Sequence, residues 1–196
     1  MNTIIFATSN DGKVATLKRA LEDAGVMTAI EQKTLELIEP QADTALEVAR
    51  SKAMQAYRLL HQPVLVDDSS FHIEALRGFP GPYIKYMQDT VGVDGIIEFM
   101  EGKTNRNAYF TSHLVYIDQD GEEFCFSDAP YYGTIALAVD ATERAKAWGP
   151  LWKIFIPSWT DKTLSQLSTK RRNAHNSAVH EVDAYEQFAL WLKNKK

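Results

Sequence analysis

The sequence predicts an α/β fold with a central mixed β-sheet flanked by helices, and three observations support this prediction. Short apolar runs of strand length alternate with longer segments whose apolar residues recur at helical spacing. A polar stretch follows the first apolar run, as expected for a turn from a strand into a helix. In the middle of the chain, residues 107–118 and 122–131 flank a Gln-Asp-Gly turn and predict an antiparallel hairpin. A hairpin within an α/β pattern predicts a mixed sheet and is compatible with two lobes and a cleft between them.

The first half of the chain predicts alternating strands and helices. We expect strands over 3–7, within 28–38 and over 63–66, with helices over 14–25 and 45–60. The first helix carries Val14, Leu17 and Leu21 at helical spacing, and Gly25 is its expected C-terminal stop. The second helix follows Thr44, a typical N-cap. Its expected inward face consists of Leu46, Ala49, Ala53, Ala56 and Leu60.

The second half adds elements on either side of the hairpin. We expect a helix over 91–101, a strand within 133–139 and a C-terminal helix over 182–194. The residues of the last helix that are expected to face inward are Val182, Tyr185, Phe188, Ala189 and Leu192. No internal repeat, low-complexity tract or linker is evident in the 196 residues, a length that suffices to bury a core.

Composition and charge narrow the range of functions. The net charge of −5 argues against broad binding to a nucleic-acid backbone. The N-terminal apolar run is too short for a signal peptide and no stretch of 18 apolar residues is present, so we expect a cytoplasmic protein. The single cysteine, Cys125, excludes an internal disulfide, and its Phe-Cys-Phe setting predicts a buried thiol. The histidines lack zinc-ligand spacing, and no Gly-x-Ser-x-Gly elbow supports a serine hydrolase.

The polar turn after the first strand has the composition of a phosphate-binding loop. It consists of Thr8, Ser9, Asn10, Asp11, Gly12 and Lys13. A loop that leads into a helix presents unpaired backbone N–H groups and the positive end of the helix dipole, and Lys13 adds a cation. It does not have the Walker A pattern. The alternative interpretation is an ordinary capped helix start.

Two adjacent acids, Asp67 and Asp68, follow the apolar strand over 63–66, which is expected to end at them. The end of a strand is where α/β folds place ligand groups. Because two neighbouring carboxylates repel each other, a divalent cation would offset the cost of ionising both, and Mg²⁺ prefers one or two carboxylates plus substrate phosphates. Glu36 or Glu39 could add a further oxygen ligand. The alternative is a solvated turn in which one of the aspartates caps the backbone.

A loop rich in glycine and proline comes next, over residues 78–85. Gly78 and Gly81 permit tight turns or a close backbone approach, while the prolines stiffen the loop. Lys85 follows directly, and together with Lys13 and Lys52 it could bind a polyphosphate. By itself, such a loop is usually only a connection.

In this order, the motifs resemble those of the inosine triphosphate pyrophosphatase family, house-cleaning enzymes that cut nucleoside triphosphates to a monophosphate and pyrophosphate. The family opens with Thr-x-Asn-x-x-Lys, which matches residues 8–13 here, and continues with an acid loop and a lysine-bearing helix, which match Glu39 and Lys52. Its acid pair followed by a serine matches Asp67, Asp68 and Ser69, and its Gly-x-Pro-Gly-x-Tyr matches residues 78–83. The resemblance covers the first 120 residues well and the remainder more faintly.

The resemblance implies an elongated, two-lobed fold with a cleft, and a single nucleoside triphosphate pyrophosphatase domain over residues 1–196. It also implies Mg²⁺ dependence and a homodimer. Asp68 would be the central metal ligand and proton acceptor, Glu39 a second metal-site acid, and Asp67 a supporting catalytic acid. The triphosphate would be bound by Thr8, Ser9, Asn10, Asp11, Gly12, Lys13, Lys52, Ser69 and Lys85.

The chain departs from the family in the half that recognises the base. The family has Phe-Gly-aromatic-Asp-Pro where residues 147–157 stand here without an aspartate, and Trp152 and Lys153 lie near that place. The family's Lys-Asn-x-x-Ser-His-Arg matches Arg172 and Asn173 but then differs at residues 176–178. Buried hydrogen bonds to a base discriminate strongly, so the usual preference for inosine and xanthosine nucleotides has lost its evident carriers. Trp152 could stack on a base, and Arg172 is also expected to bind the substrate.

The leading hypothesis is therefore a Mg²⁺-dependent nucleoside triphosphate pyrophosphatase, whose base preference is either the family's or an altered one. The first alternative is a nucleotide-binding sensor of the same fold that has lost catalysis, which the changed base-recognition segments motivate. The second is a phosphatase that acts on another phosphorylated small molecule. The three hypotheses predict different products: pyrophosphate for the pyrophosphatase, none for the sensor, and orthophosphate for the phosphatase.

Overall fold

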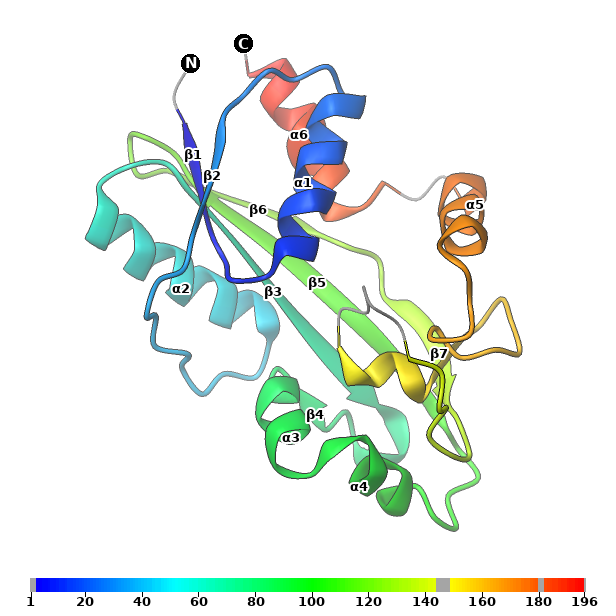
Figure 1. Cartoon of the computed structure of the whole chain (residues 1–196). Coiled ribbons are helices and arrows are strands. Elements are labelled where there is room, and N and C mark those ends of the chain that lie inside the picture. The colour runs from blue at the N-terminus through cyan, green and yellow to red at the C-terminus, as the bar shows by residue number, and fades with distance from the viewer. Residues whose placement is uncertain (1–2, 144–148, 180–181, 196) are drawn as a thin grey trace. The chain divides into compact units, whose positions relative to one another are not determined.

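The computed structural model describes residues 3–143, 149–179 and 182–195. Its strands are β1 (Ile4–Ala7), β2 (Ile30–Lys33), β3 (Val64–Ile73), β4 (Pro80–Gly81), β5 (Asn107–Ile117), β6 (Glu123–Ser127), β7 (Tyr131–Ile135) and β8 (Phe155–Pro157). Its helices are α1 (Asp11–Asp23), α2 (Ala45–Leu60), α3 (Ile84–Thr90), α4 (Gly92–Phe99), α5 (Thr169–Val179) and α6 (Ala184–Asn194), with short 3₁₀ turns η1 (Glu74–Leu76) and η2 (Pro150–Lys153). Figure 1 shows these elements along the chain. The α/β fold with a mixed sheet and flanking helices confirms the predicted class.

The chain divides into two compact units. Among the described residues, the first unit comprises the chain up to Ser69, Ser112–Ala129 and everything from Val182 onward, and the second comprises Ser70–Thr111 and the stretch from Pro130 to residue 179. Strands β3 and β5 contribute residues to both units. Each unit has its own hydrophobic core, so each is described separately.

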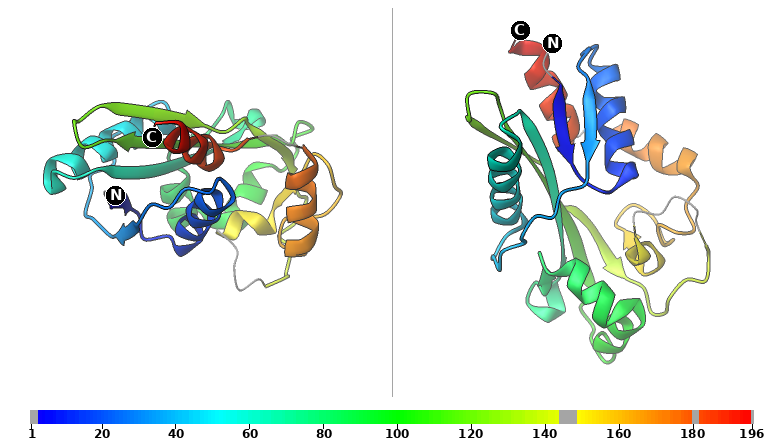
Figure 2. Two further views of the ribbon diagram at one scale, coloured as in Figure 1. Left: turned by 90° about the horizontal axis from the view of Figure 1, so that it is seen from above. Right: turned by 60° about the vertical axis from the view of Figure 1, so that its left-hand side comes forward.

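The first unit is a sheet covered by helices on both faces. β1 pairs in parallel with β2 and β3, while β6 pairs antiparallel with β5. Successive side chains of a strand point to opposite faces. Accordingly, Ile4 and Phe6 pack with α1 and α6, whereas Ile5 and Ala7 pack with α2. Helices α1 and α6 lie side by side in Figure 1 and in the left-hand view of Figure 2.

Local sequence explains why the two long helices of this unit begin where they do. Asn10 caps α1, because its side-chain oxygen accepts hydrogen bonds from the backbone N–H groups of Gly12 and Lys13. Thr44 and Glu47 form a reciprocal capping box at the start of α2. The inward face predicted for α2 is confirmed: Ala49, Ala53 and Ala56 are buried, and Leu46 and Leu60 are partly buried against the same core.

The second unit has a separate apolar core. Phe71 and Ile73 of β3 pack there with Phe155 of β8 and with residues of α4. β4 pairs antiparallel with β3, and β7 pairs antiparallel with both β5 and β8. Gly78 and Gly81 both have positive φ, at 87° and 57°, which agrees with the predicted need for glycine in this loop.

The structure corrects three details of the sequence prediction. β3 does not end at the acid pair but continues to Ile73, because the alternation of buried residues resumes at Phe71 and Ile73 beyond the acids. Cys125 is exposed rather than buried, since Phe124 and Phe126 on either side of it point into the core and turn it to the opposite face of β6. Val182 precedes the N-cap of α6 and is exposed instead of facing inward.

Other boundaries differ by a few residues. The second strand covers only Ile30–Lys33 of the predicted 28–38, and β7 (Tyr131–Ile135) begins two residues before and ends four residues before the predicted 133–139. The first arm of the hairpin and the helices at 91–101 and in the C-terminal region are confirmed within two residues, apart from Val182, whereas β6 ends at Ser127, four residues before the predicted end of the second arm. In the described part of the chain, no helix is both long and apolar enough to cross a membrane.

Candidate functional site

The turn over 8–10 and the acid pair, which the sequence predicts to belong to one site, both lie in the first unit, at the carboxyl end of β1 and within β3. Register pairs Ile5 with Val64 and Phe6 with Leu65, so the residues just after β1 lie level with the acids of β3. The turn over 8–10 and the start of α1 therefore face Asp67 and Asp68. This edge of an α/β sheet is where side chains and helix starts commonly bind ligands.

Asp67 is buried and held by several donors. Its side chain is 1% exposed, and it forms a salt bridge with Lys13 through Oδ1. The Tyr185 hydroxyl, from α6, donates a hydrogen bond to Oδ2. The hydroxyls of Ser69 and Ser112 lie 3.3 and 3.5 Å from the two carboxylate oxygens. Because a buried carboxylate is tolerated when it is paired and hydrogen-bonded, these contacts explain how Asp67 is accommodated in the interior.

Asp68 lies in a second cluster, with Lys52 between it and Glu39. The Lys52 Nζ is 2.9 Å from Glu39 Oε1 and 3.4 Å from Asp68 Oδ1. The Lys52 side chain is 15% exposed, whereas that of Glu39 is 49% exposed. One ammonium therefore contacts both carboxylates that the sequence assigns to a metal.

The electrostatics of this cluster reflect its burial. Desolvation raises the pKa of Asp68 from its ordinary 3.8 to about 6, although the charges of Lys52 and Lys13 oppose that rise. Burial by itself would lower the pKa of Lys52, but the negative charges of Asp68 and Glu39 outweigh it and the pKa is raised. The ammonium of Lys52 thus stays charged, and the Asp68 carboxyl is poised to exchange a proton near neutral pH.

The loop over 8–13 differs in one respect from the sequence prediction. The backbone N–H groups of Gly12 and Lys13 bond Asn10 Oδ1, at 2.9 and 3.2 Å, and the N–H of Asn10 bonds Thr8 Oγ1 at 3.1 Å. These three donors are therefore already used by capping, so the predicted set of unpaired N–H groups is wrong for them. Ser9 and Asp11 are exposed, and Asp11 accepts a hydrogen bond from Gln32.

The remaining predicted residues belong to the second unit. Lys85 is exposed on α3. The Arg172 guanidinium lies 4.5 Å from the centre of the Trp152 ring and also donates to the carbonyl of Leu167 at 2.7 Å. These contacts fix how Trp152 and Arg172 lie with respect to each other.

The rest of the base-recognition segments is described only in part. Lys153 forms a salt bridge with Glu143. The His175 ring stacks on Trp159, with 4.0 Å between centroids, and it is half-buried. The side chains at 176–178, and His180, lie outside the described part of the chain.

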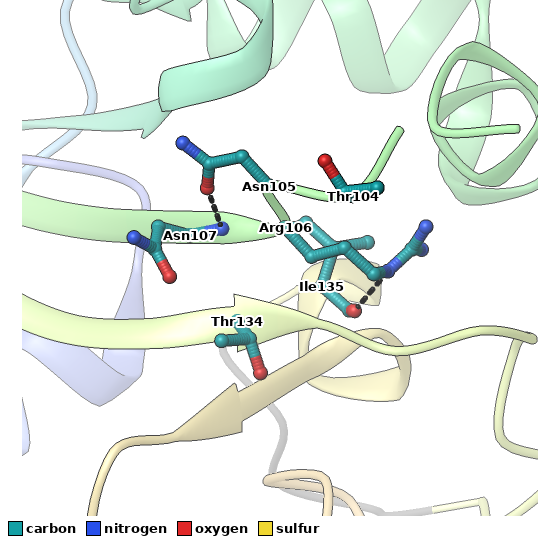
Figure 3. A pocket seen from close by; sticks show the side chains of 6 residues that line it. All are labelled: Thr104, Asn105, Arg106, Asn107, Thr134 and Ile135. Atoms are coloured by element: carbon teal, nitrogen blue, oxygen red, sulfur yellow. Dashed lines mark hydrogen bonds between the residues drawn. The ribbon is translucent and has the colours of Figure 1, made fainter. Parts of the chain in front are cut away.

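The second unit also has a surface hollow, where the Arg106 side chain serves to connect two backbone segments. It is an open space of about 550 Å³ lined by Thr104, Asn105, Arg106, Asn107, Thr134 and Ile135 (Figure 3). The Arg106 side chain donates to the carbonyls of Ile135 at 2.8 Å, Met100 at 3.0 Å and Ala136. Because three of its donors bond the backbone, Arg106 ties the turn before β5 to the end of β7.

Sequence reasoning missed two groups beside the acids. Tyr185 was expected to be a core residue, and it is buried, but its hydroxyl bonds Asp67. Asp128 was not singled out, yet it accepts a hydrogen bond from the backbone N–H of Ala184 at the start of α6. A buried tyrosine usually needs a partner for its hydroxyl, and that requirement was the available signal.

The fold and this edge of the sheet define a class: an α/β protein with lysines and carboxylates gathered where a polyanionic ligand would bind. The profile of the Ham1 family matches residues 4–191, and the chain therefore belongs to the Ham1 family. This confirms the family resemblance that the motifs predicted.

Relatives and solved structures agree with this assignment. The chain is 36% identical to a dITP/XTP pyrophosphatase of Methanopyrus kandleri, over 97% of this chain and 96% of that protein. It is 34% identical to a dITP/XTP pyrophosphatase of Thermococcus kodakarensis, over 97% of both. The structure of a HAM1 protein from Coxiella burnetii superposes with a TM-score of 0.81 at 24% identity, covering 99% of this chain and all of that one. That likeness supports the fold.

Proposed function

We propose that this protein hydrolyses nucleoside triphosphates, with dITP and XTP as the expected substrates, to the monophosphate and pyrophosphate. The observation that carries the proposal is the gathering of Lys13 and Lys52 with three carboxylates at one sheet edge of a Ham1 family chain. The names of its relatives at 34–36% identity support the substrate class.

The lysines and the loop after β1 supply the groups for a triphosphate. Lys13 and Lys52 are both partly accessible, at 18% and 15% of their side-chain area, so each can give charge to a phosphate while it remains in contact with its carboxylate. Thr8, Ser9 and Asp11 of the loop and Ser69 of β3 complete the proposed phosphate set. Lysines placed in advance where charge develops stabilise a departing pyrophosphate.

The acids fit a Mg²⁺ ion that is shared with the substrate. In the described residues no group of three or more His, Cys, Asp or Glu side chains is arranged to hold a metal. Glu39 and Asp68 nevertheless converge on one ammonium, and two carboxylates plus substrate phosphates are the usual Mg²⁺ environment. When bound, the ion would neutralise phosphate oxygens and lower the pKa of the attacking water.

The proposed reaction needs no covalent intermediate. The oxygen of a water molecule forms a bond to the α-phosphorus, while the bond from that phosphorus to the oxygen bridging to the β-phosphate breaks. Asp68 accepts the water proton, and Lys13 and Lys52 stabilise the pyrophosphate that leaves. Asp67 supports the site by holding Lys13.

The second unit is proposed to contribute Lys85, Trp152 and Arg172. Trp152 would stack on the base, and Arg172 would fix the orientation of its ring. Lys85, on α3, stays a predicted contact of the triphosphate. Because the family's Asp and Ser-His-Arg residues are replaced, we expect a base preference that includes dITP and XTP but is broader than that of the relatives.

A substrate panel tests the proposal. Purified protein is incubated with dITP, XTP, ITP and the common ribo- and deoxynucleoside triphosphates, with Mg²⁺ or with chelator, and pyrophosphate and orthophosphate are quantified separately. We expect pyrophosphate only, and only with Mg²⁺. Nucleotide binding by calorimetry without turnover would favour a sensor that has lost catalysis, and orthophosphate as the product would indicate a phosphatase.

We further propose that the protein acts as a cytoplasmic homodimer. The family resemblance supports this proposal. Light scattering coupled to size-exclusion chromatography checks it, with twice the chain mass as the expected result.

A further inference from the structure

We propose that Tyr185, on the C-terminal helix α6, is a positioning residue for the active site, acting through Asp67 on the ammonium of Lys13. The inference rests on the proposed function and deepens it. It assigns part of the catalytic arrangement to a helix that lies more than one hundred residues beyond the motifs that suggested the site.

The first step is the contact between Tyr185 and Asp67. Tyr185 is 4% exposed, and its hydroxyl donates to Asp67 Oδ2. Burial, together with the charge of Asp67, raises the pKa of Tyr185 far above its ordinary value. The hydroxyl therefore remains a donor over the whole working pH range. Asp67 Oδ2 has Ser112 Oγ as a second neighbour, at the longer distance of 3.5 Å.

The second step is the contact between Asp67 and Lys13. The Lys13 Nζ donates to Asp67 Oδ1 and lies 3.4 Å from the Asp67 backbone oxygen. An ammonium has three N–H donors, so these two contacts direct the remaining donor. Because a carboxylate is planar, a bond that fixes Oδ2 also fixes Oδ1 and so the direction in which Lys13 points.

The third step is the rigidity of the anchor. The Tyr185 ring packs against Phe6 of β1, with 6.4 Å between centroids at a T-shaped angle of 67°. Phe188 and Ala189 of α6 are buried in the same core. The start of α6 is capped by Asp183 and bonded through Ala184 to Asp128. Core packing and the hydrogen bonds at its start therefore hold α6, and with it the Tyr185 hydroxyl, in place. Precise placement of a charged group requires such a rigid support.

The consequence concerns turnover more than binding. A misplacement of about 1 Å in a catalytic arrangement can cost on the order of 100-fold in rate. With Phe at position 185, Asp67 keeps Lys13 but loses a restraint. We therefore expect kcat to fall about tenfold while KM changes less than about twofold, since placement of a preformed charge acts mainly on the transition state.

The experiment compares wild type, Tyr185→Phe, Asp67→Ala and the double variant, with Tyr116→Phe as matched control. Tyr116 is also buried and packs in the same core, against Phe188 and Trp191. We measure kcat and KM for pyrophosphate release from dITP and, separately, unfolding in urea. A purely structural role would lower the unfolding midpoint of both tyrosine variants and leave kcat at 25 °C unchanged.

The expected pattern is non-additivity. Tyr185→Phe lowers kcat about tenfold in wild type and less than twofold in the Asp67→Ala background, and Tyr116→Phe leaves kcat unchanged. If Asp67→Ala has no measurable turnover, the unfolding cycle tests only the bond between Tyr185 and Asp67, and the kcat of Tyr185→Phe compared with that of Tyr116→Phe decides the positioning role. Wild-type kcat in Tyr185→Phe, or equal losses in both backgrounds, would overturn the inference while the proposed function stands. No turnover in wild type would overturn both.

Discussion

Asp128, at the start of α6, gives a quantitative prediction for the dependence of stability on pH. Burial, reinforced by the negative charges of Asp183, Asp67 and Glu186, raises the pKa of Asp128 from 3.8 to about 7, although the hydrogen bond from Ala184 opposes the rise. The folded state therefore holds a proton that the unfolded chain has released. The stabilisation is fully present below about pH 4 and is lost as the pH rises through about 7.

The magnitude follows from the size of the shift. A rise of about three pKa units corresponds to a difference of about 4 kcal/mol in the free energy of unfolding between low and high pH. About 3 kcal/mol of this difference arises between pH 5 and pH 8. Asp128→Asn keeps the shape and the acceptor for Ala184 but has no proton to release. The variant should therefore gain about 3 kcal/mol of unfolding free energy relative to wild type between pH 5 and pH 8.

Urea unfolding at pH 5, 6, 7 and 8 in the presence of chelator measures this difference. Asp120→Asn, in the exposed turn between β5 and β6, is the control and should differ from wild type by less than about 0.5 kcal/mol at each pH. A difference between Asp128→Asn and wild type that does not change with pH, or that shrinks as the pH rises, would refute the electrostatic reasoning.

Three further predictions concern the site. Asp68→Asn should lower kcat at least about 100-fold, measured by steady-state kinetics, and near-normal turnover would mean that the proton acceptor is elsewhere. Its free energy of unfolding in urea should stay within about 1 kcal/mol of wild type, because the substitution neutralises a desolvated group. Lys13→Met should lower the free energy of unfolding by about 3 kcal/mol because it leaves the buried charge of Asp67 without its cation. Lys85→Met should lower it by less than about 0.5 kcal/mol, and equal losses would argue against a buried ion pair between Lys13 and Asp67. Arg172→Met should cost about 1–2 kcal/mol through the lost hydrogen bonds to Leu164 and Leu167, and unchanged unfolding would mean that those bonds contribute nothing.

The sequence was sufficient to locate those candidate residues whose position depends on their neighbours in the chain. The turn after β1 and the acids of β3 follow from local pattern, and parallel pairing places them at the same sheet edge. Lys52 was singled out as one of three lysines and by the family resemblance, and it lies on α2, whose capped start the sequence also predicted. These are consequences of short-range rules that a single sequence contains.

What the sequence did not predict depends on contacts between distant segments. The bond from Tyr185 to Asp67 joins residues 118 positions apart, and apolar periodicity alone assigns that tyrosine to the core. The exposure of Cys125 and the continuation of β3 past the acids were missed for a related reason. An apolar run does not reveal which residues face the core until the neighbouring strands are known.

Hydrolysis of dITP in water enriched in ¹⁸O tests the central claim most directly, because it reports which phosphorus the water attacks. Attack at the α-phosphorus predicts one ¹⁸O atom in the nucleoside monophosphate and none in the pyrophosphate, as read by mass spectrometry. At equal incubation times the Asp68→Asn variant should form at least about 100-fold less labelled monophosphate. Label in pyrophosphate, or labelled orthophosphate, would contradict the proposed cleavage between the α- and β-phosphates.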